Sequence, residues 1–256
     1  MINLRTYKNM TEAVISRNTF IVNNSLHNAF YSLTNLKSVT VLNNNVSDIS
    51  GMCAMCTNLI NYTIPLNSII NMCDVFSQCI SLTSSPVCGN NVIDMSGAYR
   101  YCNHLTGTPV CGSNVTNMSG TYANCINLTG SPVYGDNVTD LELAFVNCRN
   151  LTGSPICKPN VINMGGTYAY CINLTGSPVC GNNVTSMSSS FVFDMSGDIY
   201  DRLESFEYCG TYTGCINLTG SPVCGPNVIN MGHAYRNCTN LTGSPVCGPN
   251  VTDMDS

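Results

Sequence analysis

The stretch Asn114–Gly130, NVTNMSGTYANCINLTG, decides the fold of this 256-residue chain because close copies of it recur along the sequence. Successive copies are 23 residues apart, and a fixed period of that kind predicts a repeat protein. Counted from the methionine of each copy as position 1, units begin at Leu26, Ile49, Met72, Met95, Met118, Leu141, Met164, Met187 and Met231, and a tenth begins at Met254. The longer interval between Met187 and Met231 holds an insertion, which we place at about residues 192–212.

The residue pattern within each unit predicts one short strand and one short helical turn. Methionine, an aromatic residue and cysteine recur at positions 1, 5 and 8, the spacing of one helix face, and Ser119 is a candidate cap. The strand is clearest in Leu36–Asn44, which has an L-x-x-L-x-L-x-x-N pattern with Val39 and Val41 directed inward. We therefore expect an α/β solenoid of about nine units, in which the Val or Ile at position 16 is buried.

Most of the 17 cysteines fall in two columns, at positions 8 and 17. Leu33 takes the first column in one unit, and Leu42 and Tyr134 take the second column elsewhere, so these sites need apolar bulk rather than a thiolate. A zinc site needs paired short spacings, and Cys53–Cys56 is a single pair. We predict buried thiols, no metal and no cofactor.

Asparagine and leucine form ladders in the same way, with asparagine amides bonding to turn backbone at position 20. The predicted structural ladders are Leu105, Leu128, Leu151 and Leu174; Cys102, Cys125, Cys148 and Cys171; and Asn114, Asn137, Asn160 and Asn183.

The repeat resembles the BspA-type leucine-rich repeat of bacterial and protist surface proteins. The shared signature is V-x-x-M/I-x-x-x-F/Y-x-x-C-x-x-L, here Val115, Met118, Tyr122, Cys125 and Leu128, and it extends over residues 26–254. The resemblance implies a leucine-rich repeat fold and a non-enzymatic role in adhesion or protein binding. Members of that family usually carry a signal peptide and a surface anchor, which are not seen in this sequence.

Seven prolines depart from the family pattern, because each stands one residue before the Val or Ile of position 16. Proline cannot donate to a strand ladder. The sequence leaves two outcomes open, either very short strands or pairing that begins after the proline. A column of threonines at position 12 is compatible with an ice-binding face, but it favours an ordinary solvated surface.

The composition excludes several classes of protein. Charged residues make up 9% and the net charge is −5, so a basic surface for nucleic acid is absent. No run of 18 apolar residues is present, so no membrane span is expected. The N-terminus lacks the pattern of a secretory signal, and we expect synthesis in a reducing cytoplasm, followed by incorporation in a particle or surface assembly.

The sequence predicts a cap at the N-terminal end of the repeat array and a contact surface at the C-terminal end. Residues 1–25 should cap the first unit, with a helical start and then a strand at Thr19–Val22. The chain stops as the tenth unit begins, so we expect end-to-end or face assembly through the uncovered end.

The insertion interrupts the repeat with a concentration of charge. Ser196 is a candidate cap for an amphipathic helix running to about Tyr208, which either lies on the solenoid or protrudes as a contact element. The candidate partner contacts are Asp198, Asp201, Arg202, Glu204, Phe206 and Glu207.

The leading functional prediction is a non-enzymatic solenoid that binds a protein or surface glycan of a host or neighbour. The three histidines, His27, His104 and His233, occupy different columns and support no catalytic triad. The alternative is a structural component of a phage particle or other assembly, such as a decoration, tail or fibre protein.

Overall fold

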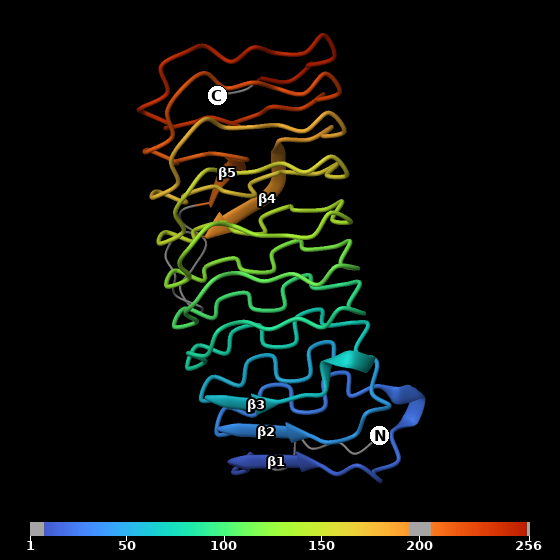
Figure 1. Cartoon of the computed structure of the whole chain (residues 1–256). Coiled ribbons are helices and arrows are strands. Elements are labelled where there is room, and N and C mark those ends of the chain that lie inside the picture. The colour runs from blue at the N-terminus through green and yellow to red at the C-terminus, as the bar shows by residue number, and fades with distance from the viewer. Residues whose placement is uncertain (1–7, 195–205, 255–256) are drawn as a thin grey trace.

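The chain winds into a stack of coils, and each coil contacts the coils before and after it (Figure 1). The computed structural model describes residues 8–194 and 206–254, without the side chains of 190–194 and 206–209. Parallel backbone bridges join residues one period apart, from Ser25 and Asp48 at the first coils to Asn230 and Asp253 at the last. The molecule is therefore a repeat fold with the period seen in the sequence.

Regular β-structure is concentrated in the first coils. β1 (Glu12–Ile15), β2 (Ser38–Val41) and β3 (Asn61–Thr63) form a parallel sheet in the order β1-β2-β3. Within β2, Val39 and Val41 are buried, whereas Ser38 and Thr40 are partly exposed. The predicted alternation is confirmed in this strand.

The segment before the first unit extends this sheet. β1 lies where the sequence predicted a helical start, and it pairs with β2 in parallel. The strand expected at Thr19–Val22 is also wrong, because Val22–Asn24 is a short 3-10 helix. A second 3-10 helix spans Leu66–Ser68. A strand is the better end for this sheet, because it pairs with backbone groups of β2 that would otherwise stay open.

The sheet ends where the prolines begin. Pro109 and Pro132 are buried, and the residue that follows the second of them, Val133, is 49% exposed. The inward direction predicted for position 16 is therefore wrong in the proline-containing coils. Since side chains alternate along extended chain, a slip of one residue exchanges the inner and outer sets. Leu42 is likewise 40% exposed, so it does not continue the second cysteine column.

The expected helical turn at positions 1–8 is not formed in the part of the chain that the structure describes. Gly120 and Asn124 have φ angles of 61° and 64°, in the left-handed region, and positions 3 and 7 repeat this conformation in other coils. The N–H groups of Gly120 and Tyr122 donate to Glu142 and Ala144 of the next coil. An α-helix needs uninterrupted right-handed residues and bonds within itself, so this segment is a series of turns bonded between coils.

The described parts of the insertion form a pair of antiparallel strands. β4 (Ser188–Asp194) pairs with β5 (Phe206–Gly210) in antiparallel fashion. The predicted helix is therefore wrong at its C-terminal end, and the rest of it lies outside the described residues. Tyr212 stacks on Tyr168 and Tyr235, with ring centroids 5.7 and 5.6 Å apart, so the repeat has resumed before the boundary expected at Tyr212.

The core is a set of parallel columns rather than a central cluster. The aromatic rings at position 5 stack from Phe76 to Tyr235. The ring centroids of Tyr99 and Tyr122 are 5.6 Å apart, and the angle between the ring planes is 6°. The predicted leucine and cysteine ladders are fully buried beside the rings: Leu105, Leu128, Leu151, Leu174, Cys102, Cys125, Cys148 and Cys171. Stacked rings of this kind stabilise each coil through its neighbours.

Candidate functional site

A groove runs along the stack between positions 20 and 22, and we call it the amide groove. One part, of about 590 Å³, lies between asparagines on one side and threonine or isoleucine on the other. A second part, of about 420 Å³, adjoins it at Asn114 and Thr116 and continues toward the N-terminal coils. The lining residues are Ser68, Ile70, Asn91, Ile93, Asn114, Thr116, Asn137, Thr139, Asn160, Ile162, Asn183 and Thr185.

The groove exists because positions 20 to 22 alternate outward and inward. Val115 and Val138, at position 21, are fully buried, and they anchor the exposed asparagine before them and the partly exposed threonine after them. The position-22 backbone bonds between coils, as in Thr139, whose N–H donates to the Thr116 carbonyl at 2.9 Å. The two walls are thereby held at the spacing of the stack.

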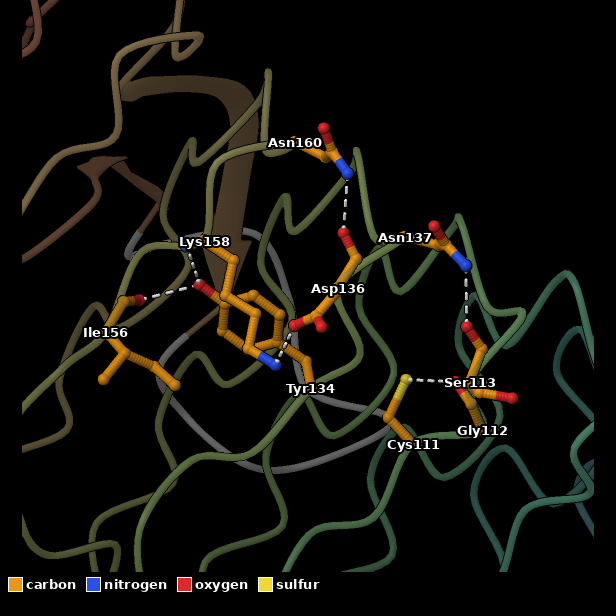
Figure 2. Close-up of polar contacts among 9 residues, drawn as sticks. All are labelled: Cys111, Gly112, Ser113, Tyr134, Asp136, Asn137, Ile156, Lys158 and Asn160. Atoms are coloured by element: carbon orange, nitrogen blue, oxygen red, sulfur yellow. Dashed lines mark hydrogen bonds and ion pairs between the residues drawn. The ribbon is translucent and has the colours of Figure 1, made fainter.

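The asparagine wall is ordered by bonds between coils (Figure 2). The amide of Asn137 donates to the Ser113 carbonyl at 2.9 Å, and that of Asn160 donates to the Asp136 carbonyl at 2.9 Å. Asn183 makes the same bond to Pro159 at 2.7 Å. In Figure 2 the amide oxygens of Asn137 and Asn160 point away from these carbonyls, so the bonds to the preceding coil use only the amide nitrogens.

The opposite wall is β-branched and partly apolar. Ile70, Ile93 and Ile162 are 47, 48 and 49% exposed, a large fraction for isoleucine in a repeated position. The threonine hydroxyls bond along the column, as Thr139 does to the Thr116 carbonyl at 3.2 Å. The groove therefore combines fixed acceptors with exposed methyl groups and has no charged residue in its lining.

A charged cluster stands beside the asparagine wall, where Tyr134 replaces cysteine (Figure 2). Lys158 pairs with Asp136 at 2.7 Å, and its ammonium lies 5.5 Å from the Tyr134 ring centre. The Tyr134 hydroxyl donates to the Ile156 carbonyl at 2.8 Å and accepts a bond from the backbone N–H of Lys158 at 3.1 Å. Because Asp136 is 88% exposed, the ion pair contributes little stability.

A second exposed stripe consists of positions 12, 14 and 16. Thr129, Ser131 and Val133 are all exposed in one coil, and the same three positions are exposed in the next coil at Thr152, Ser154 and Ile156. The position-12 threonines thus lie on the surface, as the sequence predicted. The stripe adjoins no described groove.

Both cysteine columns behave as packing. The Cys125 thiol donates to the Tyr99 carbonyl at 3.0 Å, and the same bond recurs at position 8 of other coils. Burial raises the pKa of the Cys125 thiol well above its usual range. The 16 cysteines whose side chains are described are all free, and no group of three or more His, Cys, Asp or Glu among the described residues could hold a metal.

A pocket of about 310 Å³ near the N-terminus brings His27 and Ser50 together. The Ser50 hydroxyl donates to Asp48 at 2.7 Å, so the His27 ring, 2.7 Å away, donates to Ser50 rather than taking its proton. A nucleophilic serine needs the reverse arrangement. Burial favours a raised pKa for Asp48, but bonds from Ser50 and Ser25 outweigh it and lower that pKa.

The other histidines are separate from this pocket. His104 stands in the position-10 asparagine column and bonds to the Ile80 carbonyl at 2.6 Å, as Asn127 does to Asn103 at 2.8 Å. His233 occupies a left-handed turn position with a φ of 55°. No two of the three histidines are neighbours in the pockets described.

Four of the candidate partner contacts, Asp198, Asp201, Arg202 and Glu204, lie outside the described residues. Phe206 and Glu207 belong to β5, opposite Asp194 and Phe193 of β4, and their side chains are not described. The insertion therefore stays a prediction as a contact element.

A further column was not anticipated from the sequence. At position 23, an acidic, amide or hydroxyl side chain accepts the N–H two residues later, as Asn117 does from Ser119 at 2.9 Å and Asp140 does from Glu142 at 2.9 Å. The alternation of Asn, Asp and Ser at this position was the available signal. These residues start each series of turns, so their role is structural.

No protein-family model matches this sequence, and no curated protein matches it. Among solved structures, the chain is similar to the crystal structure of a leucine rich cell surface protein from Faecalibacterium prausnitzii A2-165. The sequence identity is 15%, the match covers 94% of this chain and 88% of that chain, and the TM-score is 0.34. A likeness of this size carries no functional inference. In the described residues, no helix is long and apolar enough to cross a membrane.

Proposed function

We propose that the chain is a non-enzymatic binding protein whose amide groove holds an extended, uncharged polypeptide segment of a partner surface protein. The observation that carries the proposal is the continuity of the groove, whose two parts share Asn114 and Thr116 and together extend from Ser68 to Thr185. Six coils contribute to it, which at a strand spacing of about 4.8 Å gives a length of roughly 24 Å. An extended peptide of about seven residues fits that length.

The chemistry of the two walls supports a peptide ligand. The amide oxygens of Asn137 and Asn160, which line the groove, offer acceptors to peptide N–H groups, while Ile93 and Ile162 offer apolar contact to side chains. The lining has no charged residue, so a charged segment would lose hydration without gaining a partner. This favours neutral sequences.

The absence of catalytic groups from the same lining supports a non-enzymatic role. Asparagine, threonine, serine and isoleucine supply neither a general base nor an activated nucleophile near neutral pH. The resemblance of the repeat to BspA-type surface proteins is consistent with adhesion by such binding.

A peptide-display library selected on the immobilised full chain tests the proposal. We expect enrichment of segments of about seven neutral residues, with apolar side chains recurring along them. Replacing a wall residue by a long cation, as in Ile162→Lys, should weaken binding of the selected peptides at least tenfold. Binding is measured by calorimetry or surface plasmon resonance.

The matched control is Val133→Lys. Val133 is also 49% exposed, but it lies outside the amide groove, on the exposed stripe of positions 12, 14 and 16. That variant should bind the selected peptides as the parent chain does. Equal loss in both variants, or no loss in Ile162→Lys, would remove the groove as the binding site.

A further inference from the structure

We infer that the amide groove selects a segment of about seven residues that has apolar side chains at its first, fifth and seventh residues and a hydrogen-bond donor at its third, counted from Ile162. This assignment of the ligand rests on the proposed function, because it concerns the same groove. The order of isoleucine and threonine along one wall of the groove carries it. From the N-terminal to the C-terminal coils, that wall consists of Ile70, Ile93, Thr116, Thr139, Ile162 and Thr185.

This isoleucine–threonine wall is a regular ladder, because its backbone bonds from coil to coil. The N–H of Ile93 donates to the Ile70 carbonyl at 2.8 Å, and that of Thr116 donates to the Ile93 carbonyl at 2.9 Å. The same bond, at 2.9 Å, joins each later wall residue up to Thr185 to the one before it. Parallel bridges also join the residues that directly follow the wall residues in the chain. Since hydrogen-bonded strands lie about 4.8 Å apart, the side chains of this wall recur at that distance.

An extended peptide matches the spacing of the three isoleucines. Its residues advance by about 3.4 Å, and every second side chain faces the same wall. Ile93 lies three coils from Ile162, a distance of about 14 Å, and Ile70 lies four coils from it, about 19 Å. Four and six residues of extended peptide cover about 14 and 20 Å. A segment whose first side chain contacts Ile162 therefore places its fifth side chain on Ile93 and its seventh on Ile70.

The third residue of such a segment faces the two central threonines. It lies about 7 Å from the first residue, whereas Thr139 and Thr116 lie about 5 and 10 Å from Ile162. The Thr139 hydroxyl donates to the Thr116 carbonyl at 3.2 Å, and the Thr116 hydroxyl donates to the Ile93 carbonyl at 3.4 Å. Because both protons are directed to the preceding coil, both oxygens keep lone pairs for the ligand. A third residue with a hydroxyl or amide group satisfies them, whereas an apolar residue would cover them without a donor.

The second, fourth and sixth residues of the segment face the asparagine wall. The amide nitrogens of Asn137, Asn160 and Asn183 already donate to carbonyls of the preceding coils. Each amide still has its oxygen and one hydrogen for a ligand, so this wall can bond to polar side chains of either kind. The isoleucine–threonine wall therefore distinguishes one ligand sequence from another.

A random heptapeptide display library selected on two immobilised full-length chains tests the assignment. On the parent chain, the enriched peptides should have the stated pattern in one of the two chain directions. On the Thr116→Val/Thr139→Val chain, the third residue should become apolar while the other three preferences persist. This variant should fold normally, because the same column holds isoleucine in neighbouring coils and the backbone ladder does not use the hydroxyls.

Calorimetry then compares one selected peptide with a copy in which valine replaces the third residue. The parent chain should bind the selected peptide roughly tenfold more tightly than the copy, and the Thr116→Val/Thr139→Val chain should lose or reverse that preference. Thr129→Val is the matched control, since the Thr129 hydroxyl also donates to a carbonyl of the preceding coil, that of Gly107 at 3.4 Å, but lies outside the groove. This control should keep the preference of the parent chain.

The failure of the assigned pattern can be told apart from the failure of the proposed function. Suppose that Ile162→Lys weakens binding of the selected peptides, but the third residue is the same on the parent and Thr116→Val/Thr139→Val chains. The groove then binds peptides, and the assigned pattern is wrong. If Ile162→Lys leaves binding of the selected peptides unchanged, the proposed function fails and the pattern fails with it.

Discussion

The hydroxyl of Tyr122 bonds to both backbone groups of Val110, donating to its carbonyl at 2.7 Å and accepting its N–H at 3.1 Å. Val110 directly follows Pro109, in the segment where the strand ladder is missing. Tyr99 makes the same pair of bonds to Val87, at 2.8 and 3.0 Å. The buried tyrosines therefore supply from the side the partners that a neighbouring strand would otherwise give.

The arrangement of tyrosine hydroxyls changes around Phe145. Phe145 occupies the ring column without a hydroxyl, and the coil before it contributes Tyr134 in place of cysteine. The Tyr134 and Tyr168 hydroxyls both bond to the Ile156 carbonyl, at 2.8 and 2.9 Å. The Tyr134 hydroxyl thus joins the Tyr168 hydroxyl at one carbonyl.

Removing one such hydroxyl should destabilise the stack. Tyr122→Phe leaves the Val110 N–H and carbonyl without this partner inside the protein, at a cost of about 1–3 kcal/mol in the free energy of unfolding. Urea denaturation followed by circular dichroism measures the change. Tyr101→Phe, in a partly exposed position, is the control and should stay within about 0.5 kcal/mol of the parent. Equal effects of the two changes would contradict the role assigned to Tyr122.

Stability should fall in alkaline solution because of the buried thiols. Burial raises the pKa of Cys102 and of Cys171 from 9.0 to about 12. Between those values the unfolded chain loses thiol protons that the folded chain keeps, so the free energy of unfolding decreases as pH rises. Each such thiol contributes about 1.4 kcal/mol per pH unit, and the contribution is fully present below pH 9.

Urea midpoints at pH 8, 9.5 and 10.5 measure this dependence. Cys102→Val removes one titrating thiol and should reduce the slope by about 1.4 kcal/mol per pH unit. A slope identical to that of the parent chain would show that Cys102 does not titrate in this way.

Two glycines should respond differently to alanine. A Cβ at Gly112 would lie 2.3 Å from the Gly89 carbonyl oxygen of the preceding coil, whereas at Gly120 nothing lies within 4 Å. Gly112→Ala therefore forces neighbouring coils apart and should cost roughly 3 kcal/mol or more. Gly120→Ala pays mainly for its φ of 61°, about 1–2 kcal/mol. Thermal melts of both variants check the order, and a larger loss at Gly120 would refute the close contact at Gly112.

The repeat and several of its columns could be predicted from sequence, because residues that recur at a fixed period occupy equivalent places. Leu128 and Cys125 are buried where the pattern put them, and the alternation in β2 is as expected. The helical turn was not predictable in this way. The i, i+4, i+7 spacing of Met118, Tyr122 and Cys125 also fits turns whose left-handed residues at Gly120 and Asn124 bring the same side chains inward.

By itself, the sequence determined the 23-residue period, the stacking of like residues and the low charge content. Tertiary structure alone decided that Pro132 faces the core while Val133 faces solvent, and that positions 20 and 22 enclose a groove. It also decided that the sulfur atoms of Cys224 and Met231 meet. The physical reason is that backbone groups bond between coils, so the direction of each side chain depends on which neighbouring coil satisfies its N–H and carbonyl.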